Sequence, residues 1–244
     1  LPGLIDAAYD PWMPAFAEML PPLVAAWDRA APSDTLRARL AEPIAALRAW
    51  DHRWGEQSVP TTLAIYWAEE LTQRGRQAAS RAGMGADRWA VSGASDGERL
   101  AALAAATERL TRDFGTWRTP WGEVNRFQRL TAAIAPRFDD AAPSVPVGFT
   151  SARWGSLASF GTVQPRGLRR RYGTSGNSFV AVVEFGKDSV RARAVSAGGE
   201  SGHPTSPHFA DQAERYATGA LREVYFYPSQ LARHTQRTYR PGER

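Results

Sequence analysis

The stretch Ser178–Phe185 reads SFVAVVEF, and it decides the fold expected for the second half of the chain. Its composition is that of a β-strand. Both faces are apolar, with Phe179, Ala181, Val183 and Phe185 on one side and Val180 and Val182 on the other. A strand of this kind is expected to be covered on both sides. The turn Gly186–Ser189 and the alternating stretch Val190–Ala197 then predict a hairpin whose second strand is half exposed.

Few other strands accompany this hairpin. Val224–Tyr227 is one candidate. Two helices are expected beside it, one through Phe209, Ala213 and Tyr216 to Gly219, and a terminal one from Pro228. Two strands cannot form a stable sheet alone, because three or more strands or a covering layer are required. We therefore expect the remaining strands of this sheet to come from sequence outside the chain.

Helical periodicity dominates the first half. The clearest helix begins at the capping box Ser95-x-x-Glu98 and ends at Gly115. Pro60 is expected to open another, with Leu63, Tyr66, Trp67 and Leu71 on one stripe. Prolines are expected to interrupt the rest: Pro11, Pro14 and the Pro21–Pro22 pair break the pattern from Trp12 to Leu23, and Pro43 separates a short helix capped by Ser33 from a second one.

Two stretches are expected to be mostly loop. Gly75–Gly97 contains five glycines and few large apolar residues, and Thr116–Arg171 has no regular pattern. A long irregular stretch is uncommon in a compact domain unless it lies over another surface, which is a first indication of a missing partner. The sequence thus divides into a helical region, residues 1–115, and residues 116–244, an irregular segment followed by strands and helices.

Composition excludes several classes of protein. The chain has 244 residues and no Cys, so it has no disulfide, no thiolate nucleophile and no Cys-based zinc or iron–sulfur site. Because a protein without thiols is stable in reducing and in oxidising surroundings, the absence of Cys does not indicate the cellular compartment. No apolar run approaches the roughly 18 residues of a membrane-spanning helix. Leu1–Gly3 lacks the basic and apolar regions of a signal peptide.

The positive charge has an ordinary explanation. The formal net charge is +5 and the pI is about 9.9, but 29 of the 30 basic residues are Arg, which indicates codon bias more than a phosphate-binding surface. The densest basic run, Arg166–Arg171, is interpreted as a solvated loop, with anion binding as the alternative. No aromatic platform accompanies it, so binding of nucleic acid is a minor hypothesis.

Searches for catalytic and metal-binding motifs find none. Gly199–His203 reads GESGH, which is not a G-x-S-x-G elbow, and we interpret it as a turn leaving the strand. His203 and His208 are separated by prolines and have no carboxylate at liganding spacing. Gly173–Asn177 lacks the ending of a phosphate-binding loop and is interpreted as a turn entering the strand. His52 and His234 are isolated and are expected to be surface or satisfied core residues.

The last third of the chain resembles the closing segment of the penicillin acylase family. The resemblance is carried by Gly176–Phe185 and Ala197–Gln212, and it is strong from Gly173 to Gly219. Further matches are Leu47–Asp51 with Ser58, the run Pro120–Arg126 (PWGEVNR), Tyr216–Gly219 and the ending Tyr239–Glu243. The resemblance covers nearly the whole chain and is weaker before Asp51. The run Pro120–Arg126 resembles a "W-G-x-x-x-R" segment typical of the acyl-homoserine lactone and aculeacin-type lipopeptide acylases.

The resemblance implies a four-layer αββα N-terminal-nucleophile hydrolase, an α+β fold. Such an enzyme cuts its own precursor into an α and a β chain. The new N-terminal Ser of the β chain is the nucleophile, its α-amine is the base, and a backbone N–H and an Asn side chain hold the oxyanion. Residue 1 here is Leu, which has no nucleophilic atom. The chain therefore resembles the C-terminal part of a β subunit, and no catalytic, cofactor-binding or metal-binding residue is assigned in it.

The resemblance also sets the expected activity and partners. The chain is expected to belong to an amide hydrolase that removes an acyl group from a β-lactam, an acyl-homoserine lactone or a lipopeptide. Its partners would be the α subunit and the N-terminal part of the β subunit, in the periplasm or outside the cell. No cofactor is expected in the chain, because ligands of the family's structural calcium would lie elsewhere. The alternative is a non-catalytic scaffold or fragment without activity of its own.

Overall fold

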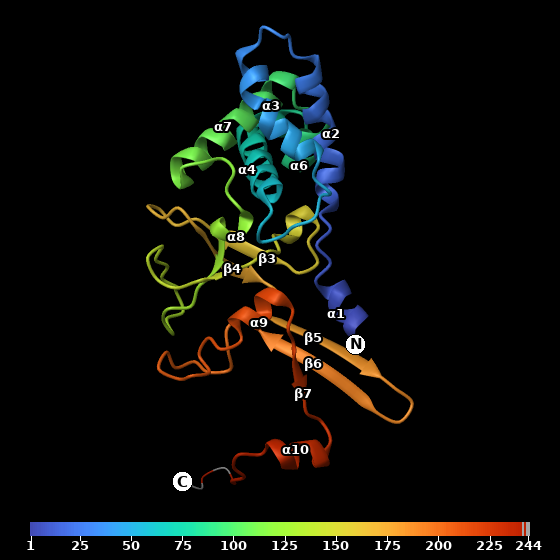
Figure 1. Cartoon of the computed structure of the whole chain (residues 1–244), viewed down its shortest axis with the longest axis vertical. Coiled ribbons are helices and arrows are strands. Elements are labelled where there is room, and N and C mark those ends of the chain that lie inside the picture. Colours follow the sequence, from blue (N-terminus) through green and yellow to red (C-terminus); the bar gives the residue numbers. More distant parts are fainter. Residues whose placement is uncertain (241, 243–244) are drawn as a thin grey trace.

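The computed structural model describes residues 1–240 and 242. A helical bundle forms one end of the molecule, two small sheets follow, and a C-terminal arm extends beyond the second sheet (Figure 1). The helices are α1 (Pro2–Ala8), α2 (Pro14–Arg29), α3 (Thr35–Arg48), α4 (Val59–Arg74), α5 (Arg76–Arg81), α6 (Ala86–Ser92), α7 (Asp96–Phe114), α8 (Trp121–Val124), η1 (Ala152–Trp154), α9 (Ala213–Thr218) and α10 (Pro228–His234). The strands are β1 (Asn125–Phe127), β2 (Val145–Pro146), β3 (Phe160–Val163), β4 (Arg171–Gly176), β5 (Phe179–Phe185), β6 (Val190–Ser196) and β7 (Arg222–Val224).

The expected α+β class is confirmed. In the part of the chain that the structure describes, no helix combines the length and the apolarity needed to cross a bilayer. The ending Tyr239–Glu243, which contributed to the resemblance, lies partly outside the described residues.

The bundle packs α2, α3, α4 and α7 around one apolar core. Trp67 of α4 is fully buried, and its indole N–H donates to the carbonyl of Arg99 in α7, at 3.1 Å. Helix α4 begins where expected, with Ser58 as its N-cap and Pro60 in the first turn. Helix α7 begins at the predicted capping box and ends at Gly115, whose φ of +84° is the left-handed conformation that favours glycine.

The capping box of α7 gives the first testable prediction. The Ser95 hydroxyl accepts the Glu98 backbone N–H at 3.3 Å, and the Glu98 carboxylate accepts the Ser95 backbone N–H at 2.8 Å. We expect Ser95→Ala to lower the free energy of unfolding by about 1 kcal/mol, because the cap is lost. Urea denaturation measures the change. Ser92→Ala is the control: its exposed hydroxyl only donates back to the carbonyl of Arg88, so an equal loss in both variants would contradict the capping role.

Pro11 lies before α2 and Pro14 is its first residue, as expected, but the later prolines do not interrupt the helices. Helix α2 continues through Pro21 and Pro22, and α3 is one helix that contains Pro43. The carbonyls that lose a partner at Pro21 and Pro22 belong to Ala17 and Glu18, which are exposed, so water can hydrogen-bond them while the opposite face remains packed. The cap of α3 is Asp34 instead of Ser33: its carboxylate accepts the Leu36 N–H, at 2.8 Å.

The loop expected over Gly75–Gly97 is also wrong, because α5 and α6 lie within it. The glycines in this stretch make room for the buried Trp89 of α6 instead of breaking helices. A Cβ on Gly75 would lie 1.8 Å from the Trp89 ring, and one on Gly93 would lie 2.5 Å from it. Burial of that indole holds the two short helices against the bundle.

The stretch Thr116–Arg171 contributes most of a sheet that the sequence did not reveal. The strand order is β2-β1-β4-β3, with β1 parallel to β4 and the other pairs antiparallel. Strands of two to four residues from this stretch are too short to show a periodicity, so only pairing between segments defines them. Strands β1 and β3 pair with β4, and β2 pairs with β1.

The second sheet contains the expected hairpin, in the order β5-β6-β7. Phe179 pairs with Ser196 and Phe185 with Val190, so the turn is where the sequence placed it. The third strand is Arg222–Val224, slightly earlier than the predicted Val224–Tyr227. Helix α10 begins at Pro228 as predicted, and α9 ends at Gly219 as predicted but begins at Ala213, so Phe209 lies before it.

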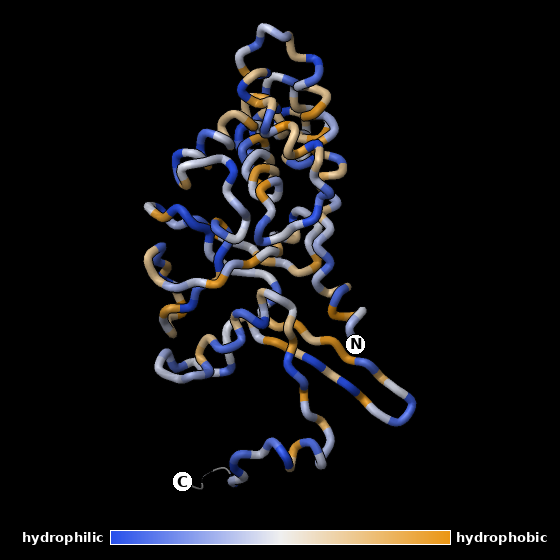
Figure 2. Tube along the Cα trace, viewed as in Figure 1, coloured by the Kyte–Doolittle hydropathy of each residue, from blue (hydrophilic) through white to orange (hydrophobic). Residues whose placement is uncertain are grey.

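One face of β5 is open, and here the expectation of cover on both sides fails. Val180 and Val182 are buried in a cluster with α1 and α9. On the other face Phe179 is 61% exposed, Val183 42% and Phe185 81%. Hydrophobic residues run along β5 (Figure 2). On this outer face their side chains are exposed, and no other described segment covers them.

Phe149 is the centre of the second apolar core. It is fully buried, and its ring lies 5.2–5.8 Å, between centroids, from four other aromatic rings, those of Tyr9, Trp54, Phe160 and Tyr216. Those partners come from segments far apart in the sequence. This aromatic cluster therefore joins the N-terminal segment, the first sheet and α9.

Candidate functional site

The family-like segment Ala197–Gln212 forms a closed loop after β6. The Gln212 N–H donates to the Gly198 carbonyl at 2.8 Å, and the Ser201 N–H donates to the His208 carbonyl at 3.1 Å. A Cβ on Gly199 would lie 2.2 Å from the His208 carbonyl oxygen, so this position requires glycine. The predicted interpretation of Gly199–His203 as a turn leaving the strand agrees with this geometry.

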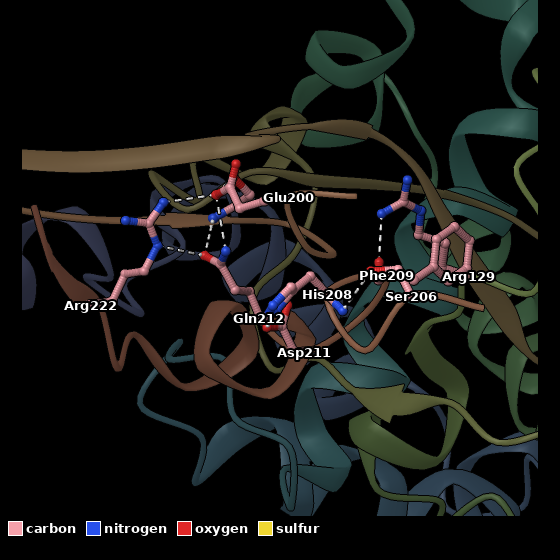
Figure 3. Close-up of polar contacts among 9 residues, drawn as sticks. Arg129, Glu200, Ser206, His208, Phe209, Asp211, Gln212 and Arg222 are labelled. Atoms are coloured by element: carbon pink, nitrogen blue, oxygen red, sulfur yellow. Dashed lines mark hydrogen bonds and ion pairs between the residues drawn. The ribbon is translucent and has the colours of Figure 1, made fainter. Parts of the chain in front are cut away.

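Glu200 is the centre of a polar network at the base of the loop (Figure 3). Its Oε1 accepts hydrogen bonds from Arg222 at 2.8 Å, Gln212 at 2.9 Å and the Ser196 hydroxyl at 3.0 Å. These three donors, Arg222 foremost, hold the pKa of the Glu200 carboxyl below its ordinary value. A carboxylate stabilised by three donors is a poor proton acceptor. Glu200 therefore connects β6, the loop and β7, and it has no features of a general base.

Gln212 completes this network from the start of α9. It is 5% exposed, and its Oε1 accepts the Ser196 backbone N–H at 3.0 Å. The side-chain amide thus takes the position of a neighbouring strand at the end of β6. Sequence periodicity could not reveal it, because one buried polar residue at a helix start leaves no repeating pattern.

The nearby His208 does not form a catalytic triad. Its Nδ1 lies 2.8 Å from Asp211 Oδ2, but the imidazole side chain is 68% exposed. The Ser201 and Ser206 hydroxyls accept the backbone N–H groups of His203 and His208, each at 3.1 Å, and within the described residues neither hydroxyl is hydrogen-bonded to the imidazole. Each serine therefore stabilises a local turn.

No metal site is found in the described part of the chain. Residues 1–240 and 242 contain no group of three or more His, Asp or Glu side chains placed to hold an ion. His52 lies between the Trp12 and Trp50 rings, and His234 stacks on Tyr225 with ring centroids 3.8 Å apart. No residue of this chain is therefore assigned to the calcium that the resemblance implies.

The run Pro120–Arg126 forms a joint between the bundle and the first sheet. Arg126 donates to the Gly122 carbonyl at 2.8 Å and to the Ser144 hydroxyl at 2.9 Å, and burial lowers the pKa of its guanidinium. Asn125 is fully buried, and its amide donates to the carbonyl of Val147 at 2.7 Å. The contacts of this run within the chain are therefore structural.

The basic run Arg166–Arg171 is not a uniformly solvated loop. Arg171 is buried and forms a bidentate pair with Glu69 of α4, with Nη1 to Oε1 at 2.7 Å. Asp140 accepts the Arg169 backbone N–H and the Tyr172 hydroxyl, both at 2.7 Å. The long-range partners, which lie 29 to 102 residues away, could not be deduced from the run itself.

The predicted turn at Gly173–Asn177 is mostly strand. It forms the rest of β4, and a Cβ on Gly173 would lie 2.2 Å from the Phe160 ring of the neighbouring strand. Only at Gly176, with φ of +118°, does the backbone adopt a conformation that favours glycine. The glycines therefore reflect close packing within the sheet as well as the turn into β5.

A comparison with protein families identifies the family of this chain. A sequence model of the penicillin amidase family matches residues 2–233. The chain belongs to the penicillin amidase family. The family expected from Gly176–Phe185 and Ala197–Gln212 is thereby confirmed, whereas the acyl-homoserine lactone branch and the place in a β subunit stay predictions.

Among solved structures, this penicillin amidase chain is similar to the thermostable penicillin G acylase from Alcaligenes faecalis in its orthorhombic form. The identity is 15% and the TM-score is 0.46. The match covers 94% of this chain and 46% of that one. The chain thus spans less than half the length of that acylase.

Proposed function

We propose that this chain is the C-terminal portion of an acylase whose nucleophilic Ser lies on a part of the protein outside these 244 residues. The observation that carries the proposal is the open apolar face of β5, the strand that pairs with β6, after which the family-like loop begins. Strand β5 is also the edge of its sheet, so its outer backbone groups are free to pair with a further strand. An exposed apolar face together with an unpaired edge favours a missing protein layer.

The proposed reaction is hydrolysis of an amide that links an acyl group to an amine. The Ser hydroxyl would attack the amide carbon, with its own α-amine accepting the proton; the C–N bond would then break, the protonated amine would leave, and water would hydrolyse the acyl-enzyme to the free acid. The residues described here would support that site from behind without touching substrate. A β-lactam, an acyl-homoserine lactone and a lipopeptide remain the candidate substrates, and self-processing and a periplasmic or secreted location belong to the same proposal.

The test is reconstitution. We expect the chain alone to show no hydrolysis of a chromogenic acyl amide, and co-production with the upstream part of its protein to restore it. N-terminal sequencing and mass analysis of the active material should find a companion chain that begins with Ser. A homogeneous 26.7 kDa species that lacks such a companion would instead support the non-catalytic scaffold.

The apolar face gives a sharper prediction for the same assembly. We expect Phe185→Ser to weaken association with the upstream part by about tenfold to a hundredfold, because burial of a Phe side chain contributes about 1.5–3 kcal/mol. Leu157→Ser is the control, since Leu157 is 63% exposed but lies outside the second sheet. Analytical ultracentrifugation of the mixed parts measures both. Equal association of the Phe185 variant and the unchanged chain would show that this face has no partner.

A further inference from the structure

Arg129 is a half-buried cation without a carboxylate partner among the residues that the structure describes. Its Nη1 donates to the Phe209 carbonyl at 2.6 Å, and its guanidinium carbon lies 4.1 Å from the centroid of the Phe209 ring (Figure 3). These contacts orient the side chain but do not neutralise it. Partial burial of an unpaired charge is costly, so an anionic partner would be favoured here.

A cavity of about 350 Å³ lies beside this guanidinium. The cavity is lined by aromatic rings, those of Phe127, Phe160 and Tyr216. Arg129 is the only charged side chain in the described lining, which contains no carboxylate. The volume lies at the lower end of small-ligand sites, which are about 300–1,000 Å³. The lining also includes the polar side chains of Thr131, Thr174, Ser175, Asn177 and Ser178. Aromatic rings and neutral polar groups beside one cation suit a ligand that has an apolar part and one negative group.

The family-like loop leaves room for this arginine. A Cβ on Gly198 would lie 3.1 Å from Arg129 Nη1, 3.2 Å from its Cδ and 3.5 Å from the Phe127 ring. Gly198 also accepts the Gln212 N–H, so its backbone is fixed by the loop. The loop therefore places a residue without a side chain against the guanidinium, at the edge of the cavity.

We propose that this cavity binds a monocarboxylate with an apolar tail. The carboxylate would pair with the Arg129 guanidinium, whose charge has no other carboxylate partner in the described residues, and the tail would lie against Phe127 and Phe160. Amide hydrolysis releases an acid of this class, but the proposal rests on the cavity and requires no catalysis by the chain.

The test measures binding to the natural protein that contains this chain, with hexanoate as the probe. Isothermal titration calorimetry should detect hexanoate, with hexanamide and hexylamine at least tenfold weaker, because only hexanoate combines the tail with a negative charge. Arg129→Gln should weaken hexanoate binding at least tenfold, and Arg129→Lys should recover part of the loss. Thermal unfolding of each variant confirms that it is folded.

A matched control separates charge at the cavity from the general loss of an arginine. Arg37 also contacts an aromatic ring, that of Trp27, and donates to backbone carbonyls, but it lies in the bundle, away from this cavity. Arg37→Gln should leave hexanoate binding unchanged.

Two outcomes would overturn the proposal. One is that the natural protein does not bind hexanoate, as expected if another segment of that protein fills the cavity. The other is that the Arg129→Gln variant binds hexanoate as tightly as the unchanged protein does. Neither outcome depends on hydrolysis, so failure here is distinguishable from failure of the reconstitution experiment.

Discussion

Replacement of Glu69 by Gln is expected to lower the free energy of unfolding by about 3 kcal/mol, because it leaves the Arg171 guanidinium buried without its counter-charge. The Arg171 side chain is only 9% exposed, whereas that of Glu69 is 30% exposed, so we expect the lower end of the range for a broken buried pair. Arg171 also lies over the Tyr66 ring, 4.6 Å from its centroid, and cannot turn to water without disturbing the bundle. Urea denaturation followed by circular dichroism measures the loss.

The loss of unfolding free energy in the Glu69→Gln variant should depend on pH in a defined direction. Burial alone would raise the pKa of the Glu69 carboxyl, but Arg171, with Arg109 and Arg153, outweighs it and holds the pKa below the ordinary 4.5. A carboxyl with a depressed folded-state pKa contributes stability above its unfolded pKa and loses it as the pH falls through the folded value. The difference in free energy of unfolding between the unchanged chain and the Glu69→Gln variant should therefore have its largest value above about pH 5 and decrease below pH 4.5.

Glu70 provides the matched control on the next position of the same helix. It pairs with Arg74 at 2.5 Å, four residues along α4, but that arginine is 53% exposed. Glu70→Gln should cost only about 0.3–0.5 kcal/mol. A loss of similar size at both positions would show that the Glu69–Arg171 pair behaves as a surface pair.

Phe149→Ala is the second variant with a large expected effect. We expect it to lower the free energy of unfolding by about 3–5 kcal/mol, because a fully buried ring is removed and a cavity is left. The loss should also loosen the N-terminal segment, because Tyr9 packs edge-on against Phe149, with centroids 5.7 Å apart. Hydrogen exchange at α1 should therefore accelerate more than at α7. Denaturation of the same variant gives the magnitude.

Two further variants make the Phe149 prediction specific. Phe149→Leu should lose less, since most of the volume is kept. Phe226→Ala should change stability by no more than about 0.5 kcal/mol, because Phe226 is 64% exposed on the C-terminal arm. If Phe149→Ala were as mild as Phe226→Ala, the aromatic cluster would not be the element that joins the segments.

The sequence by itself determined the elements whose signals are local. The capping box at Ser95 and Glu98, the first turn of α4 at Pro60, the hairpin around Gly186–Ser189 and the end of α9 at Gly219 were all predictable. Each depends on side chains within a few residues of the backbone groups that they satisfy. The family could also be recognised, from the segments Gly176–Phe185 and Ala197–Gln212.

Tertiary structure alone decided where distant groups meet. It kept α2 helical through Pro21 and Pro22, because burial of one face outweighs two lost hydrogen bonds on the solvent side. It paired Arg171 with a carboxylate 102 residues away, and it brought Arg129 beside a cavity lined from several segments. Burial and charge pairing of this kind depend on which surfaces lie in contact, and a local pattern of residues does not contain that information.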